Sequence, residues 1–328
     1  MRYGMTLTIA LGVMALVGCA GNPEQSEAQG AGGSSDQSGN NMVEVDFQGG
    51  PEGPEYQDPA LPDEFLNQDP PRNAGQFSTD FSRATVSFAD VISGGPPKDG
   101  IPAIDDPSFV SIDQADEWLS SDESVLVVTR NGDTHIYPVQ ILMFHEIVNS
   151  VIGEVPVTVT FCPLCNTGAA FLRNFDGHTM DFGVSGMLRF SNLIMYDRQT
   201  ETWWQQATGK GIAGRYAGGQ LEILPILMLP WDEASSEYSN AQVLSRQTGH
   251  ARSYGRNPYA GYDRSSRPFL YQGPEIDGEY DPMTRVLTLN INGDSSGHPY
   301  PVLKEQQVVN DTVGGTPVVV MWQDGTAS

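Results

Sequence analysis

Apolar and polar residues alternate over short stretches through most of the chain, with glycine and proline between the stretches. Alternation with a period of two is typical of strands, and the turn residues between them favour antiparallel pairing. One stretch has its apolar residues at helical spacing instead. The elements predicted around it are a strand over 124–129, an Asn131-Gly132 turn, a strand over 134–137, a helix over 139–149 and a strand over 155–160. We therefore predict a mainly β (α+β) fold of antiparallel strands with short helices.

The segment 286–322 repeats the pattern of the segment 125–161. Both segments begin with Val-Leu, turn at Asn-Gly-Asp and continue with Tyr-Pro-Val. Ordered matches over such a length predict an internally duplicated unit. We place the first unit at about residues 85–235 and the start of the second at about residue 283. A second unit like the first would need further strands after Ser328, so we expect the second unit to be incomplete.

Residues 1–19 resemble the signal peptide of a bacterial lipoprotein. Arg2 precedes a short apolar run over residues 6–17, which is too short to cross a bilayer as a helix. Leu16-Val17-Gly18-Cys19 then resembles a lipobox, which makes Cys19 the expected lipidation site and the membrane the expected partner. The alternative is an ordinary signal peptide that contains a cysteine by chance. Because Ala20 follows Cys19, the resemblance favours a place in the cell envelope at the outer membrane, if the source is Gram-negative.

The composition of residues 20–75 predicts a flexible tether. These residues are rich in glycine, serine, glutamine, asparagine, proline and acids, and such a segment buries too little apolar area to offset its ordering entropy. The folded domain is predicted over residues 76–328. The formal net charge of the chain is −24, which argues against nucleic acid as a partner.

The chemistry of the chain is expected at a CxxC pair, Cys162 and Cys165, which follows a predicted strand. Two thiols at this spacing can share a metal ion or close a redox-active ring. His145 lies on the predicted helix nearby. The second copy replaces all three residues, with Gln306, Gln323 and Thr326 at the positions of His145, Cys162 and Cys165. The three residues thus occur as a set, and we predict that they bind copper or zinc.

Two alternatives to the metal site stay open from the sequence. The first is a thiol–disulfide oxidoreductase that uses the Cys162 and Cys165 pair, although no thioredoxin-like βαβ pattern surrounds it. The second is a non-catalytic binding or structural module. Both alternatives leave open whether the protein is an enzyme.

Several further residues are predicted to surround the site. Glu146 is expected to be a solvated charge, and one of the neighbours Trp203 and Trp204 is expected to be exposed because side chains alternate along a strand. The residues expected to contact a substrate or to support the ligands are Lys98, Asp99, Ser185, Met195, Asp197 and Arg198.

Five motifs of the chain resemble those of one bacterial family. They are Tyr137-Pro-Val-Gln-Ile-Leu, His145-Glu-Ile-Val-Asn, Cys162-Pro-Leu-Cys, Phe182-Gly-Val-Ser-Gly and Met195-Tyr-Asp-Arg-Gln-Thr. With these motifs, the chain resembles domain-of-unknown-function family 3179 over about residues 85–328. It departs from the family at Ser150, where the family often has Asp, and at Phe161, where it often has Tyr. The resemblance implies an exported protein and implies no particular activity.

Lipidation of Cys19 gives the first testable prediction. Replacing Cys19 with Ser removes the thioether attachment point, so the variant should be released from the membrane fraction while the parent stays in it. Fractionation of cells followed by immunodetection measures this. Equal membrane retention of both proteins would contradict the lipobox interpretation.

Overall fold

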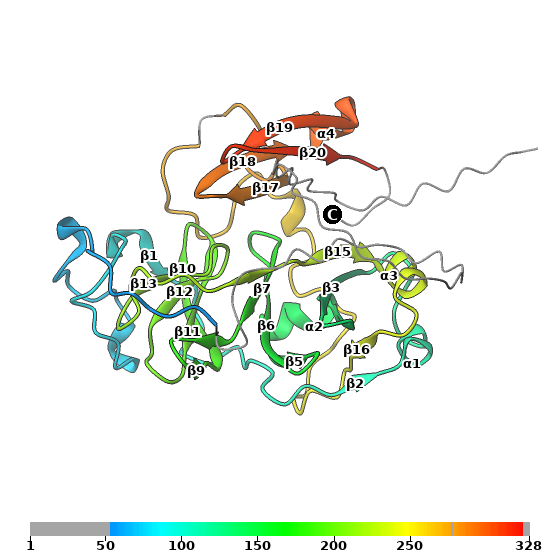
Figure 1. Cartoon of the computed structure of the whole chain (residues 1–328), viewed down its shortest axis with the longest axis horizontal. Helices are drawn as coiled ribbons and strands as arrows, with labels where there is room; N and C mark the ends of the chain where they lie inside the picture. The colour runs from blue at the N-terminus through cyan, green and yellow to red at the C-terminus, as the bar shows by residue number, and fades with distance from the viewer. Residues whose placement is uncertain (1–52, 277, 324–328) are drawn as a thin grey trace, which may run out of the picture. The chain divides into compact units, whose positions relative to one another are not determined.

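The structure of the chain is a computed structural model that describes residues 53–276 and 278–323 (Figure 1). Within these residues the chain divides into two compact units, a larger one up to residue 283 and a smaller one from residue 284. The predicted signal peptide and its Cys19 lie outside the described residues. No helix among the described residues is long and apolar enough to cross a membrane.

The larger unit is built mainly from short strands. Its strands are β1 (Val91–Ser93), β2 (Phe109–Val110), β3 (Ser124–Arg130), β4 (Asp133–Pro138), β5 (Ile147–Ile152), β6 (Val155–Cys162), β7 (Thr167–Leu172), β8 (Asn174–Phe175), β9 (His178–Thr179), β10 (Phe182–Arg189), β11 (Asn192–Asp197), β12 (Trp203–Gln205), β13 (Lys210–Ala213), β14 (Ile223–Leu224), β15 (Leu227–Pro230) and β16 (Gln242–Leu244). Its helices are α1 (Ile112–Asp116), α2 (Val139–His145) and α3 (Trp231–Glu237).

The strands of the larger unit form three main sheets. Their orders are β1-β10-β11-β12-β13, β14-β7-β6-β5 and β15-β3-β4-β16-β2. The pairs within them are antiparallel except for β16 with β4, which is parallel. The prediction of a mainly β fold with antiparallel sheets and short helices is therefore confirmed.

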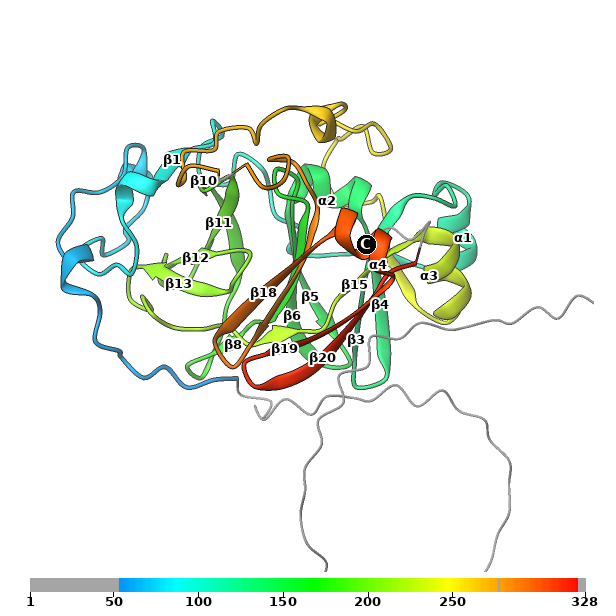
Figure 2. The same cartoon turned by 90° about the horizontal axis from the view of Figure 1, so that it is seen from above.

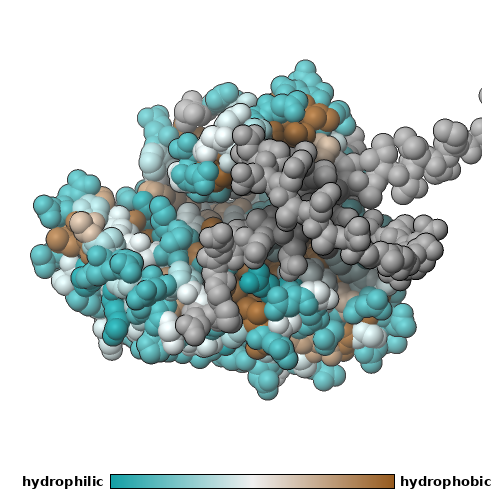
Figure 3. All heavy atoms as spheres, viewed as in Figure 1, coloured by the Kyte–Doolittle hydropathy of each residue, from teal (hydrophilic) through white to brown (hydrophobic). Residues whose placement is uncertain are grey.

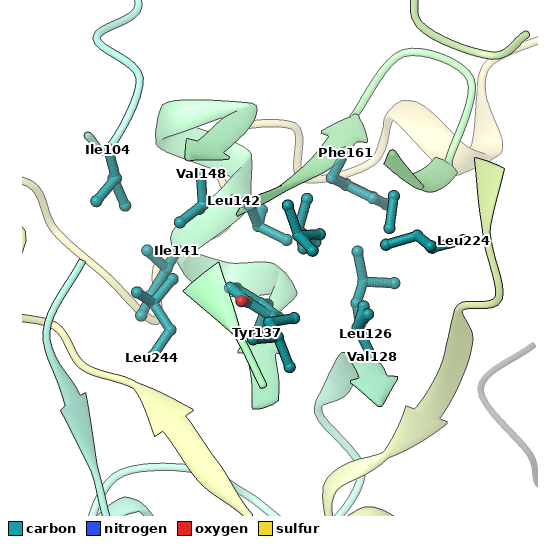
Figure 4. Close-up of a cluster of buried hydrophobic side chains, with 14 of the residues drawn as sticks. Ile104, Leu126, Val128, Tyr137, Ile141, Leu142, Val148, Phe161, Leu224 and Leu244 are labelled. Atoms are coloured by element: carbon teal, nitrogen blue, oxygen red, sulfur yellow. The ribbon is translucent and has the colours of Figure 1, made fainter. Parts of the chain in front are cut away.

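The sheet that contains β5, β6 and β7 is buried on both faces. Successive side chains of a strand point to opposite faces. Val159 and Phe161 therefore enter the cluster shared with α2, β3 and β4 (Figure 4), whereas Cys162 enters the cluster shared with β10, β11 and β12. Figure 2 shows β5 and β6 between these two groups of strands. The last residue of β6 thus carries a thiol into the interior.

Helix α2 is shorter than the sequence pattern suggested. The helix predicted over residues 139–149 ends at His145, and Glu146 adopts the left-handed conformation with a φ of 59°. The next residues, from Ile147, form β5 instead, because their β-branched side chains pair with β6 and fill the core on both sides. The turn at Gly153 therefore joins two strands and does not end a helix.

The expectation that one of the neighbouring tryptophans is exposed is wrong. Trp203 and Trp204 are both fully buried. Their side chains do point to opposite faces of β12, but each face of this sheet is covered. Trp203 packs with Phe77 and Phe81, and Trp204 packs with Phe175.

Packing contacts begin before the boundary predicted at residue 76. The Tyr56 ring lies 5.1 Å from the ring of Tyr216, and its Oη donates a hydrogen bond to the Ala217 carbonyl oxygen at 2.9 Å. Ala74 is buried as well. The rest of the predicted tether, up to residue 52, lies outside the described residues.

The smaller unit has the same order of elements as the segment from β3 to β6. Its elements are β17 (Val286–Ile291), β18 (Asp294–Pro299), α4 (Tyr300–Gln306), β19 (Val308–Val313) and β20 (Thr316–Met321). The strand registers correspond as well, since Val286 pairs with Pro299 as Val125 pairs with Pro138. A left-handed residue follows each helix, Gln307 in one copy and Glu146 in the other. This agreement supports the predicted duplication.

Polar side chains cover most of the visible surface of both units (Figure 3). This matches the low mean hydropathy of −0.30 and the excess of acids over bases in the chain.

Candidate functional site

The CxxC pair lies at the tip of the hairpin formed by β6 and β7. Cys162 is the last residue of β6 and pairs with Thr167, the first residue of β7, so residues 163–166 form the connecting loop. The predicted position of the pair at the end of a strand is confirmed, and a second strand begins directly after it. Both cysteines are free thiols.

A second hairpin tip, between β10 and β11, meets the first. Arg189 pairs with Asn192, and the two residues between them, Phe190 and Ser191, have φ values of 53° and 61°. A two-residue hairpin turn of this kind needs positive φ at both positions, which non-glycine residues adopt at an energetic penalty. The turn places the Ser191 carbonyl oxygen 3.7 Å from the Cys162 Sγ.

Cys165 is the more accessible thiol and the more acidic one. Its side chain is partly exposed. Hydrogen bonds from Cys162, Thr167 and Asn192 favour the thiolate, and they lower the pKa of Cys165 to about 7 although burial opposes the shift. The Asn192 amide nitrogen lies 3.1 Å from the Cys165 Sγ. Cys165 is therefore ionised to a larger extent at neutral pH than an ordinary thiol.

A buried network of amides holds Asn192 in this orientation. The Asn192 Oδ1 accepts hydrogen bonds from the Gln205 side chain and, at 3.1 Å, from the Ala207 backbone. The Asn192 Nδ2 donates to the Gln206 Oε1 at 2.8 Å, and Gln206 in turn donates to the Thr160 hydroxyl at 2.9 Å. Because its oxygen is occupied on one side, Asn192 presents its N–H group to the Cys165 sulfur.

Cys162 differs from Cys165 in both exposure and acidity. Its side chain is 1% exposed and packs among apolar residues. Burial raises the pKa of Cys162 well above that of an ordinary thiol, and the nearby Cys165 and Glu146 raise it further. Cys162 therefore stays a neutral thiol while Cys165 ionises.

Glu146 is buried beside the thiols, so the expectation of a solvated charge is wrong. The Glu146 N–H donates to the Leu142 carbonyl at 2.7 Å, and its own carbonyl accepts from the Phe161 N–H at 2.8 Å. These bonds fix Glu146 opposite the residue that precedes Cys162. Burial, and next the charge of Cys165, raise the pKa of Glu146 to about 8, so this carboxyl is mostly protonated at neutral pH.

The structure gives His145 other partners than the two thiols. The His145 Nδ1–H donates to the Pro102 carbonyl at 2.7 Å, and its Nε2 accepts from the Tyr254 hydroxyl at 2.6 Å. Burial lowers the pKa of His145 to about 4, so the ring is neutral. Among the described residues, no three His, Cys, Asp or Glu side chains converge in a way that could hold a metal ion. The copper or zinc site with Cys162, Cys165 and His145 as ligands stays a prediction.

Three of the other predicted site residues belong to a cluster of ion pairs. Lys98 pairs with Glu201, and Arg198 pairs with Asp105 at 2.6 Å. Asp99 lies 3.8 Å from Arg198 and accepts a hydrogen bond from Tyr196. The set contains two positive and three negative groups. Among the described residues, no hydrogen bond connects it to either thiol.

The remaining three predicted residues are buried. Ser185 donates to the Ile194 carbonyl at a bulge of β10, and Met195 packs in the same apolar cluster as Cys162. Asp197 accepts hydrogen bonds from Thr200 and, at 2.9 Å, from the Trp204 indole. These contacts hold the β10–β11–β12 sheet together behind the site.

Sequence reasoning missed two residues of the site as the structure forms it, Glu146 and Asn192. A signal for Glu146 existed, because the second copy replaces it with Gln307 together with the loss of both cysteines. Asn192 gave no such signal, since an asparagine beside a hairpin turn is common and its contact with Cys165 depends on the meeting of two hairpins.

Comparison with known proteins identifies the family. A family model described as "Protein of unknown function (DUF3179)" matches residues 98–328. The chain belongs to this family. The resemblance found from the motifs is thereby confirmed. No curated protein and no solved structure matches the chain.

The buried carboxyl predicts a pH-dependent stability. The pKa of Glu146 rises from 4.5 to about 8 on folding. The contribution of this side chain to the free energy of unfolding is therefore fully present below about pH 4.5 and is lost as the pH rises towards 8. Glu146→Gln removes this titration and should therefore be stabilised relative to the parent by on the order of a few kcal/mol at about pH 8. The second copy has a glutamine at this position, so the side chain suits the left-handed backbone.

Urea unfolding of reduced protein at about pH 5 and pH 8 measures the effect. Glu154→Gln is the matched control, because Glu154 is an exposed glutamate that also has positive φ. Its unfolding free energy should follow that of the parent at both pH values. An equal difference between Glu146→Gln and the parent at both pH values would show that Glu146 does not titrate in this range.

Proposed function

We propose that the protein is a thiol–disulfide oxidoreductase that uses Cys165 as the attacking thiol and Cys162 as the resolving thiol. The observation that carries the proposal is the asymmetry of the pair. Cys165 is partly exposed and receives an N–H···S bond from Asn192, whereas Cys162 is enclosed. Exchange with an external disulfide needs one accessible sulfur that ionises easily, and a second, buried thiol can then resolve the mixed disulfide.

The first step is an attack by the Cys165 thiolate on one sulfur of a substrate disulfide. A bond forms between Cys165 and that sulfur, the substrate S–S bond breaks, and the second substrate sulfur leaves as a thiolate that takes a proton from water. A pKa near 7 suits this step, because the thiolate fraction is large and the nucleophilicity of the sulfur is still substantial.

The second step needs Cys162 to lose its proton inside the protein. In the fraction of molecules whose Glu146 is ionised, its carboxylate accepts this proton, and the loss of the Cys165 charge in the mixed disulfide enlarges that fraction. Cys162 then attacks the Cys165 sulfur, and the remaining substrate sulfur leaves as a thiolate and takes the proton from Glu146. The protein disulfide has formed, two electrons have passed to the substrate, and the substrate has become two thiols.

The expected location at the cell envelope suits this chemistry. An exported domain meets disulfides as substrates, and its own disulfide must be returned to the dithiol by an external dithiol donor. The lipid anchor at Cys19 would keep the domain at the membrane surface. The location and the anchor are part of the proposal.

The metal-binding hypothesis remains a prediction with its own test. If Cys162, Cys165 and His145 bind zinc or copper, protein purified under reducing conditions should contain about one equivalent of the metal per chain, whereas much less metal would favour the dithiol function. Stoichiometric metal that is lost on replacing either cysteine or His145 would favour the metal site over the dithiol function.

Single cysteine variants test the order of the two thiols. Cys162→Ser keeps the attacking thiol and lacks the resolving one, so it should accumulate a mixed disulfide with glutathione disulfide at close to one equivalent. Cys165→Ser keeps only the buried thiol and should form the mixed disulfide at least about tenfold more slowly. Mass spectrometry of the intact, acid-quenched protein measures both adducts.

The same experiment decides against the proposal if the pattern differs. Faster adduct formation by Cys165→Ser than by Cys162→Ser would reverse the assigned roles. Equal and slow reaction of both variants, at the rate of an unperturbed thiol, would leave no basis for an exchange function.

A further inference from the structure

A basic segment lies against the dithiol in an otherwise acidic protein. Residues 246–271, here called the arginine strap, contain five arginines and one acidic residue, Asp263, whereas the whole chain has 17 basic and 41 acidic residues. In Figure 2 the strap runs in yellow to orange from near α2 towards β1 and β10. The net charge of −24 for the whole chain does not reveal that this segment is positively charged.

Hydrogen bonds attach the strap to both hairpin tips of the dithiol site. The Tyr262 Oη donates to the Leu164 carbonyl, within the CxxC loop, at 2.9 Å, and it accepts from the Phe269 N–H at 3.0 Å. The Ser191 hydroxyl donates to the Phe269 carbonyl at 2.7 Å. Tyr254 bonds His145 at the other end. The strap therefore borders the loop that carries Cys165.

One strap arginine is anchored and four are not. Arg246 donates to Gln140 and stacks its guanidinium over Trp118 at 4.5 Å. The other four are exposed, and none forms an ion pair within the part of the chain that the structure describes; they are Arg252, Arg256, Arg264 and Arg267. Elsewhere in the same unit Arg83, Arg173, Arg189 and Arg198 each have a carboxylate partner, whereas Arg72, Arg130 and Arg215 form no ion pair among the described residues.

We propose that the arginine strap binds an acidic stretch of polypeptide next to the disulfide of the substrate. This inference rests on the proposed function and names its substrate class. Guanidinium groups bind carboxylates through paired N–H···O bonds. The strap interleaves them with tyrosines, and arginine and tyrosine are two of the three residue types enriched among the residues that dominate binding at protein interfaces. Four arginines spread along 16 residues, from Arg252 to Arg267, suit an extended partner better than a small anion.

Charge also favours a polypeptide over an anionic membrane surface. Screening limits electrostatic attraction to about 8–10 Å at physiological salt. A short acidic segment can lie within this distance of the strap without approaching the acidic rest of the protein. A broad anionic surface would also lie close to the acidic rest of the protein, which would repel it. Attraction to the segment should then raise the association rate more than it changes the chemical step.

Paired peptides test the inference on the otherwise complete Cys19→Ser chain. Two peptides carry the same disulfide, one flanked by glutamates and one by serines and glutamines. At low salt the reduced protein should react about tenfold faster with the acidic peptide, through a lower KM at unchanged kcat, and added salt should remove the preference. Arg264→Gln with Arg267→Gln should reduce the preference to about threefold and leave the reaction with the neutral peptide unchanged.

The matched control removes the same charge elsewhere. Arg72 and Lys210 are exposed residues outside the strap, and the double variant Arg72→Gln, Lys210→Gln should keep the full preference. A control variant that loses as much preference as the strap variant would show that only net charge matters. Equal rates of the parent with both peptides would overturn the inference and leave the dithiol function standing.

A binding measurement separates this inference from the exchange chemistry. Fluorescence anisotropy of a labelled glutamate-rich peptide without cysteine should show binding that the strap variant weakens several-fold. If exchange fails but this binding holds, the proposed function is wrong, and only the binding of acidic polypeptide by the strap stands. Absence of peptide binding, or stronger binding to vesicles of equal parts phosphatidylglycerol and phosphatidylcholine, would contradict it.

Discussion

The burial of both faces of the β5–β6–β7 sheet is the constraint on which the site depends. Because neighbouring residues of a strand point to opposite faces, a strand that ends at Cys162 must send this thiol into one of two apolar clusters. Cys165 lies three positions later, in the loop, and remains at the rim. The pKa of Cys162 is therefore raised and the pKa of Cys165 is lowered, because the two cysteines occupy different positions in one hairpin.

The same constraint explains the other unusual features of the site. Helix α2 packs on the far face of the sheet and must reverse into β5 within one residue, which places Glu146 in the left-handed conformation and turns its carboxyl inward. The β10–β11 tip closes the near face with two further residues at positive φ, Phe190 and Ser191. A buried carboxyl and a strained turn both lower stability, and such features are expected at functional sites.

Much of the fold could be predicted from local patterns. Asn-Gly turns, β-branched runs and the repeated motifs indicated the hairpins, the position of the CxxC pair and the order of elements in the second copy. The end of α2 could not be predicted, because apolar spacing fits a helix or a two-face-buried strand equally well from Ile147 onward. The burial of Trp203 depends on a covering segment, with Phe77 and Phe81, that is distant in the sequence.

The site was predicted only in part, for the same reason. The two cysteines stood out by composition, whereas Glu146 and Asn192 act through contacts that form when separate hairpins meet. Comparison of the copies suggested His145 as a ligand, and the structure gives both its nitrogens to Pro102 and Tyr254. These two contacts account for the burial of His145.

The central claim is the difference in acidity between the two thiols, and the pH dependence of alkylation tests it most directly. Reduced protein is treated briefly with iodoacetamide over a range of pH, and the modification of each cysteine is followed separately by mass spectrometry. Cys165 should react with a midpoint near pH 7 and Cys162 much more slowly, and Asn192→Ala should raise the Cys165 midpoint by about one unit. A midpoint near the ordinary thiol value of 9 for Cys165, or faster modification of Cys162, would contradict the account.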